Sequence, residues 1–291
     1  FGDVVANENA SLDIRPGEIL SVLGENGSGK TTLMNMLSGI YYPDSGKIYV
    51  NGKEVNIKSP TDALNLGIGM VHQHFKLIDI FTAAENIILG LHDGKVFIDK
   101  KTVNEKIKQI CDKYGFTLNL EQKVYEMSVS QNQTLEIVKV LFRGVDILIL
   151  DEPTAVLTPQ EVKKLFSVIR NMRADGKSVV IITHKLHEIF EISDRVVILR
   201  KGTVVDSVDI KDATPATLTE MIVGGKVDLN IERPEPGERA KKIEIKNLNV
   251  INSDGLPALS DVSFDIFGGE ILGIAGISGC GQKELLESIA G

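Results

Sequence analysis

The sequence predicts an α/β fold with a mostly parallel β-sheet flanked by helices. Short runs rich in β-branched residues alternate with segments of helical pattern, as in doubly wound sheets. These runs are apolar along their whole length, which is typical of parallel strands buried on both faces. We expect strands at residues 18–23, 68–71, 147–150, 178–182 and 195–199, and helices at residues 30–39, 159–174 and 185–192.

The segment from about residue 82 to residue 140 differs from its surroundings. Residues 83–89 and 101–114 have helical patterns, and no long β-branched run lies in this segment. We therefore expect a helical insertion between two strands of the sheet. A small β contribution is expected near the N-terminus.

The composition excludes several other classes of protein. Of the 291 residues, 43% are apolar and 25% are charged, which is ordinary globular composition. The 32 basic and 40 acidic residues give a net charge of −8, so no nucleic-acid partner is expected. The two cysteines, Cys111 and Cys280, lie far apart in the sequence and fit free thiols in a reducing compartment. No apolar run approaches the roughly 18 residues that a membrane-spanning helix needs.

The end of the chain repeats its beginning at an offset of 252 residues. Segments 11–14 and 17–20 fall on 263–266 and 269–272, and Gly24, Gly27 and Gly29 fall on Gly276, Gly279 and Gly281. We expect a first domain over residues 1–230, a charged linker with prolines over 231–241, and the start of a second copy over 242–291. Because the chain lacks an initiator methionine and stops at Gly291, we expect it to be part of a longer protein.

Residues 24–31 match the phosphate-binding loop pattern G-x-x-x-x-G-K-[ST] between a predicted strand and a predicted helix. The glycines permit turns that aim backbone N–H groups inward, and the helix N-terminus favours bound anions. Lys30 is expected to reach the β and γ phosphates, and the Thr31 hydroxyl to bind Mg²⁺. The alternative is a glycine-rich turn without a ligand, which the lysine makes less attractive.

Two acidic residues, Asp151 and Glu152, follow the apolar run at 147–150. Carboxylates at the end of a buried strand are costly unless a cation or polar group meets them. We expect Asp151 to hold Mg²⁺, directly or through water, and Glu152 to polarise an attacking water. The alternative is that Glu152 only begins a solvated loop.

Polar residues also follow two other predicted strands. Gln73 comes after the strand at 68–71, and His184 comes after the strand at 178–182. The carboxyl ends of parallel strands share one edge of the sheet, where ligands bind. We therefore expect Gln73, Asp151, Glu152 and His184 to gather beside the glycine-rich loop.

These residues in this order resemble the nucleotide-binding subunit of ATP-binding cassette (ABC) transporters, over residues 1–225 and again over 242–291. The resemblance implies a P-loop NTPase fold, ATP and Mg²⁺ as cofactors, and catalytic roles for Lys30, Glu152 and His184. It also implies that Thr31, Gln73 and Asp151 approach the metal, and that Phe1 stacks on adenine. The Walker A motif corresponds to Gly24, Glu25, Asn26, Gly27, Ser28, Gly29, Lys30, Thr31 and Thr32. The Walker B motif corresponds to residues 147–152, and the D-loop to residues 155–158.

Segments 71–75 and 151–159, with the tandem arrangement, resemble bacterial importers of simple sugars and nucleosides, and residues 72–75 favour the nucleoside branch. This implies membrane permease subunits as partners, a second cassette of the same chain, and indirectly a periplasmic or lipoprotein substrate-binding protein. It also implies a peripheral location at the cytoplasmic face of the membrane. The alternatives are a soluble, translation-factor-like tandem ATPase and a nucleotide-binding module with little turnover.

The sequence departs from the family at two motifs. The signature motif at residues 127–131 has Ser130 where the family has glycine, and the second glycine-rich loop has Gln282 in place of the lysine. The resemblance places Ser128, Ser130 and Gln131 at the nucleotide of a partner cassette, although Ser128 and Gln131 also fit a helix capping box. We therefore expect one hydrolytic site and one impaired site in the complete protein.

Overall fold

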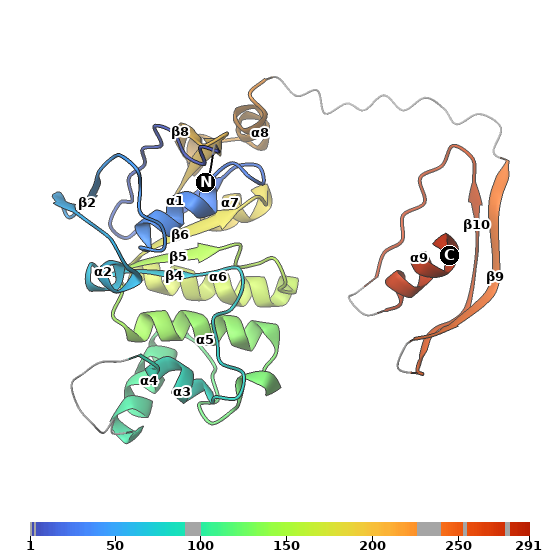
Figure 1. Cartoon of the computed structure of the whole chain (residues 1–291), viewed down its shortest axis with the longest axis horizontal. Helices are drawn as coiled ribbons and strands as arrows, with labels where there is room; N and C mark the ends of the chain where they lie inside the picture. Colours follow the sequence, from blue (N-terminus) through green and yellow to red (C-terminus); the bar gives the residue numbers. More distant parts are fainter. Residues whose placement is uncertain (1, 3, 91–99, 226–239, 253–254, 277–279) are drawn as a thin grey trace. The chain divides into compact units, whose positions relative to one another are not determined.

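The computed structural model describes residues 2, 4–90, 100–225, 240–252, 255–276 and 280–291. It divides into two compact units, Phe1–Val227 and Asp228–Gly291 (Figure 1). Phe1 and most of the expected linker, residues 231–239, lie outside the described residues. Each unit is described by itself below.

The first unit is built on a six-stranded sheet with the order β4-β5-β6-β1-β7-β8. The neighbours from β4 to β7 pair in parallel, and β8 pairs antiparallel to β7. The strands are β1 (Ile19–Leu23), β4 (Ile68–Val71), β5 (Ile147–Asp151), β6 (Ser178–Thr183), β7 (Arg195–Arg200) and β8 (Thr203–Asp209). All five predicted strands are present, and the predicted fold class is confirmed; β8 was not predicted.

Helices cover both faces of this sheet. Consecutive strand residues point to opposite faces. Leu148 and Leu150 accordingly pack with Phe166 of α6 (Pro159–Ala174), whereas Ile149 packs with Met34 of α1 (Lys30–Leu37). Figure 1 shows α1 on one side of the sheet and α6 on the other. Burial on both faces explains why the strands are apolar throughout. The remaining helices of this part are α2 (Pro60–Asn65), α7 (Leu186–Ile192) and α8 (Pro215–Val223).

The helical insertion lies between β4 and β5, as predicted. It contains α3 (Ala83–Ile88), α4 (Lys100–Tyr114), the 3₁₀ turn η1 (Val124–Glu126) and α5 (Val129–Phe142). Leu135 and Val138 of α5 belong to the core of the insertion, whereas Ile137 and Leu141 of the same helix belong to the core beneath the sheet. Helix α5 therefore joins the insertion to the sheet through two buried faces.

The β contribution near the N-terminus is a small antiparallel hairpin of β2 (Ile48–Val50) and β3 (Lys53–Val55). Asn51 and Gly52 form its turn with φ values of 51° and 75°. Positive φ at both central residues is the geometry that favours Asn-Gly in tight hairpins.

The second unit contains β9 (Lys241–Ile251) and β10 (Pro257–Phe267), which pair antiparallel, and α9 (Gln282–Ala290). Gly281 precedes α9 with a φ of 91°, and Gly29 precedes α1 with a φ of 94°. A Cβ on Gly281 would lie 2.7 Å from the Ala258 carbonyl oxygen, and one on Gly29 would lie 2.5 Å from that of Ala6. Ala258 and Ala6 are themselves 252 residues apart, so this backbone contact follows the sequence repeat.

The two copies differ where the first copy has its central strand. Residues 271–275 align with β1 but form no strand in the described part of the second unit. Ile271 is 92% exposed there, whereas its counterpart Ile19 is 1% exposed. Strand β1 pairs with β6 and β7, and its side chains are buried because helices cover both faces of the sheet; Ile19 packs with Phe166 of α6, and Leu20 packs with Met34 of α1.

Candidate functional site

The glycine-rich loop connects β1 to α1 and folds around the side chain of Lys30. The Lys30 ammonium is buried and donates hydrogen bonds to the carbonyl oxygens of Gly24 (2.9 Å) and Glu25 (2.7 Å). Burial lowers the pKa of Lys30, and the nearby carboxylates of Glu152 and Asp151 partly oppose this effect. Glu25, Asn26 and Gly27 are exposed, so this side of the loop faces solvent.

Two glycines of the loop are required by close backbone contacts. A Cβ on Gly24 would collide with the Leu199 carbonyl oxygen and the Ser28 hydroxyl. Gly29 combines a φ of 94° with close approach to the Ala6 carbonyl oxygen. Both positions therefore exclude a side chain, for steric reasons independent of any ligand.

The loop has the features expected of a phosphate site. Ser28 is only 5% exposed, and its hydroxyl has no hydrogen-bond partner among the residues that the structure describes. An unpaired buried hydroxyl costs free energy that a bound oxyanion can recover. Together with the Lys30 ammonium and the N-terminus of the eight-residue helix α1, the loop offers suitable groups for a polyphosphate. Thr32 lies half-buried in the first turn of α1.

Asp151 ends β5 beside the first turn of α1. Its carboxylate accepts a hydrogen bond from the Thr31 hydroxyl, with Oγ1 3.0 Å from Oδ2. Burial raises the pKa of Asp151, and the Thr31 hydrogen bond opposes this rise. Hydroxyl and carboxylate oxygens are the hard donors that suit Mg²⁺, which binds through one or two protein groups plus substrate phosphates. No cluster of three or more His, Cys, Asp or Glu that could hold a metal occurs among the described residues, and such a Mg²⁺ site does not need one.

Glu152 is the point where three predicted residues meet. Its Oε1 lies 3.2 Å from Nδ1 of His184, and its Oε2 accepts a hydrogen bond of 3.4 Å from Nε2 of Gln73. The Glu152 backbone is left-handed (φ 46°), and its N–H donates to the Ile182 carbonyl oxygen at 2.9 Å. Such a conformation is unusual for a non-glycine residue. It persists where the surrounding structure imposes it, and it is frequent at functional sites.

The structure therefore brings the predicted edge residues together in three contacts. Thr31 meets Asp151, and Glu152 meets both Gln73 and His184. The shared edge of the parallel strands β4, β5 and β6 explains this, because Gln73, Asp151 and His184 lie at or just after the strand ends.

The expected signature residues lie at the start of α5. Ser128 and Gln131 form a reciprocal capping box, with the Ser128 N–H 2.8 Å from the Gln131 Oε1. Hydrogen bonds from Thr158, with a smaller contribution from the Ser130 side chain, lower the pKa of Glu161. Within the described part of the chain, none of these three residues hydrogen-bonds to residues 24–32.

Three polar residues near the site were not predicted. Asn7 donates to the Gly29 carbonyl oxygen at 3.3 Å, and Gln133 donates to the Pro153 carbonyl oxygen at 2.6 Å. Glu188 is a buried carboxylate on α7. Gln133 and Glu188 lie on helices among buried apolar residues, a pattern that signals a paired polar group but not its partner.

A cavity of about 360 Å³ opens beside Gln73. Residues after β4, from the insertion and from the segment after β5 line it, including His74, Phe75, Leu77, Val129 and Val156. Ile80, which is 70% exposed, follows the lining residues Leu77 and Asp79 in the sequence. This face is therefore both concave and partly apolar.

Comparison with known proteins adds three findings. Residues 7–155 match the family described as ABC transporter. The chain is 47% identical over 292 residues to the nucleoside import ATP-binding protein NupA of Lactococcus lactis, and 46% identical over 292 residues to the guanosine import ATP-binding protein NupO of Bacillus subtilis. These alignments include 100% of this chain but only 58% and 57% of the two relatives, so the chain spans less than two thirds of their length.

Solved structures with a similar fold are also ATP-binding cassettes. One cassette of an ABC transporter in its ADP conformation superposes with a TM-score of 0.67 at 24% identity, covering 77% of this chain and 94% of that chain. A dimeric bacterial ABC transporter cassette has a TM-score of 0.63 at 25% identity, covering 72% and 94%. The described fold of the first unit is thus shared with these cassettes.

Proposed function

The chain belongs to the ABC transporter family, and we propose that it is the ATP-binding and ATP-hydrolysing subunit that energises a membrane importer of nucleosides or simple sugars. The observation that carries the proposal is the position of Glu152, which contacts Gln73 and His184 at the same sheet edge as Lys30 and Asp151. The names of the relatives support the class of cargo, since NupA and NupO are described as nucleoside and guanosine import proteins.

Each residue of the site has a role that follows from its chemistry. Lys30, the Ser28 hydroxyl and the loop N–H groups bind the phosphates of ATP, and Lys30 exchanges its two carbonyl contacts for phosphate oxygens. Thr31 and Asp151 would hold Mg²⁺, and Gln73, just after the end of β4, would be a further ligand or neighbour of the ion. Bound Mg²⁺ neutralises charge on the phosphates.

Glu152 orients the attacking water and accepts its proton at a carboxylate oxygen. His184, whose Nδ1 faces the Glu152 carboxylate, holds that side chain and reaches toward the terminal phosphate. Both side chains remain partly exposed, at 19% for Glu152 and 49% for His184, so a nucleotide can reach them.

The second part of the proposal concerns the complete protein. Ser128, Ser130 and Gln131 contribute to the nucleotide site of a partner cassette, and a further cassette begins at about residue 242. Gln282 supplies an amide where Lys30 supplies an ammonium, and an amide stabilises phosphate charge less well. We therefore propose one hydrolytic site, built on Lys30 and Glu152, and one impaired site. Residues 277–279 of the second loop lie outside the described residues.

We further propose that membrane permease subunits dock at the cavity beside Gln73, and that a substrate-binding protein acts through them. Such docking would make the chain a peripheral subunit at the cytoplasmic face of the membrane. Among the described residues, no helix combines the length and apolarity that crossing a bilayer would require. The partly apolar lining of the cavity and the exposed Ile80 support a protein partner at this face.

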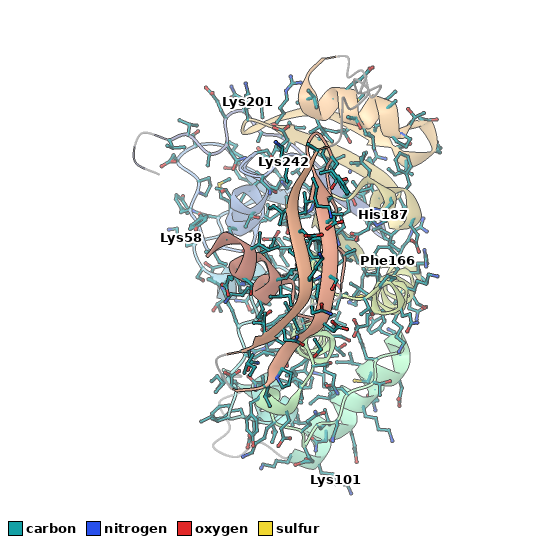
Figure 2. The ribbon with its side chains drawn as sticks, turned by 90° about the vertical axis from the view of Figure 1, so that its right-hand side faces the viewer. Lys58, Lys101, Phe166, His187, Lys201 and Lys242 are labelled. Atoms are coloured by element: carbon teal, nitrogen blue, oxygen red, sulfur yellow. The ribbon has the colours of Figure 1, made fainter. Side chains whose placement is uncertain are left out.

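The test is MgATP binding and single-turnover hydrolysis by this chain, compared with Lys30→Ala. Lys58→Ala is the matched control, because Lys58 is exposed (Figure 2) and forms no part of the site. We expect Lys30→Ala to weaken ATP binding at least tenfold, which corresponds to the loss of one charge-assisted hydrogen bond of about 1.5–3 kcal/mol. Equal affinity and turnover in the three proteins would refute the proposal. Rapid multiple turnover by this chain alone would refute the one-site arrangement.

A further inference from the structure

A buried polar network lies behind the contact between Glu152 and His184. Its centre is Glu188 on α7, which is 2% exposed. The Glu188 Oε2 accepts hydrogen bonds from the hydroxyls of Thr154 (2.7 Å) and Thr183 (3.3 Å), and its Oε1 lies 3.1 Å from the Lys185 ammonium. A buried carboxylate is costly unless it is paired and hydrogen-bonded, and here both oxygens have partners.

The partners of Glu188 are sequence neighbours of the two residues that meet at the site. Thr183 and Lys185 flank His184, and Thr154 follows Glu152 by two positions. Lys185 strengthens the connection, because its ammonium donates to the Thr154 carbonyl oxygen at 3.0 Å and to the Thr154 hydroxyl at 3.2 Å. The network therefore joins the segment after β5 to the segment after β6.

This connection begins where the sheet ends. Asp151 and Ile182 are the last register pair between β5 and β6, and the Glu152 N–H then bonds to the Ile182 carbonyl oxygen. After that bond the chain following β5 and the chain following β6 no longer form strands, and the hydrogen bonds and ion pair of Glu188 connect them instead. On its other side, the Pro153 carbonyl oxygen is bound by Gln133 of α5.

We propose that Glu188 is a positioning residue that holds His184 against Glu152 through Thr154 and Lys185. The inference rests on the proposed function, since it assigns Glu188 a part in ATP hydrolysis without contact to the nucleotide. Besides Lys185, His187 also approaches Glu188, with its Nε2 4.0 Å from Oε1. The His187 side chain is 77% exposed on α7 (Figure 2).

A purely structural role would give a different result from a positioning role. Helix α7 is held in the core by Ile189 and Ile192, which are buried independently of Glu188. A structural anchor would therefore affect the stability of the whole unit, whereas a positioning residue affects the segments that carry Glu152 and His184. The two roles can be distinguished by two measurements. A positioning residue affects amide exchange only in those segments, and it affects ATP turnover but not ATP binding.

The test compares Glu188→Gln with the matched control Glu191→Gln on the same helix. Glu191 is 44% exposed and lies 3.8 Å from Arg170 at the surface, so its substitution makes the same chemical change outside the network. For Glu188→Gln we expect an ATP dissociation constant within twofold of the unsubstituted chain and a single-turnover rate constant at least tenfold lower. We also expect at least tenfold faster hydrogen exchange in peptides covering 152–157 and 183–186, with no change in β1. Glu191→Gln should change none of these three quantities by more than twofold.

A second variant, Thr154→Val, removes the bridging hydroxyl while keeping the side-chain shape and should reproduce the local increase in exchange. Unchanged exchange in both variants would overturn the inference, as would an increase spread equally over β1 and the two segments. If the unsubstituted chain binds MgATP no more tightly than Lys30→Ala does, the proposed function fails instead. The exchange measurement then still decides whether Glu188 holds the two segments together.

Discussion

Alanine substitutions in the glycine-rich loop should separate steric from conformational requirements. In Gly29→Ala, the new Cβ would lie 2.5 Å from the Ala6 carbonyl oxygen at a φ of 94°. A left-handed alanine costs about 1–2 kcal/mol, and an overpacked contact about 1–3 kcal/mol more. We therefore expect Gly29→Ala to lower the free energy of unfolding by about 2–5 kcal/mol. In Gly27→Ala the φ is 78° but nothing lies within 4 Å of the new Cβ, so only about 1–2 kcal/mol is expected.

The assay is urea unfolding followed by tyrosine fluorescence. The chain has five tyrosines and no tryptophan, and all five tyrosines lie between residues 41 and 125. The signal therefore reports the first unit alone. Equal losses of stability for Gly27→Ala and Gly29→Ala would refute the reasoning, because the two positions differ mainly in the contact with Ala6. A loss below 1 kcal/mol for Gly29→Ala would refute it as well.

Three further predictions concern other parts of the first unit. Glu152→Gln should preserve ATP binding and reduce steady-state hydrolysis by the complete protein about 10²–10⁴-fold, because an amide cannot accept the proton of water; an ATPase assay showing most activity retained would contradict this. Arg195→Met removes the guanidinium whose Nη2 lies 2.8 Å from Oε1 of the buried Glu18, and so leaves that carboxylate without its cation. Urea unfolding should therefore show a free energy of unfolding lower by about 3–5 kcal/mol, and an unchanged value would contradict this. Hydrogen bonds from Lys113 and Tyr114 lower the pKa of Asp175 below its ordinary 3.8, so its carboxylate contributes stability above that pH and loses it as the pH falls through the lower, folded-state pKa. The stability difference between Asp175→Asn and the unsubstituted chain should be present at about pH 7 and shrink toward about pH 2; a difference constant across this range would be inconsistent with the cause.

The central strands could be predicted because burial on both faces leaves a simple pattern. An apolar run such as residues 147–150 has few alternatives to a buried strand. Strand β8 lacks this pattern because it is an edge strand with exposed residues, including Val205 at 39% exposure. The hairpin of β2 and β3 was expected only as a small β contribution, since strands of three residues carry little periodicity.

The site could be predicted as far as its residues follow strands. Parallel strands share an edge, and this brings Gln73, Asp151 and His184 to one place. The hydrogen bonds of Asn7, Gln133 and Glu188 could not be predicted in the same way. Their partners are backbone carbonyls, hydroxyls and one ammonium at or beyond the ends of strands and helices, and the positions of such groups depend on packing between elements rather than on periodicity.

The contact beneath the last glycine of each loop has a consequence for how duplicated sequences diverge. Gly29 and Gly281 both lie against a backbone carbonyl, although the next residue is Lys30 in one copy and Gln282 in the other. The contact with Ala258 would penalise any replacement of Gly281 even if the second loop never bound a ligand. After a duplication, positions limited by sterics change slowly, and positions limited only by turnover are free to drift. The glycines of such a loop therefore indicate its backbone conformation, whereas the residue after the last glycine indicates whether the loop can bind phosphate through an ammonium.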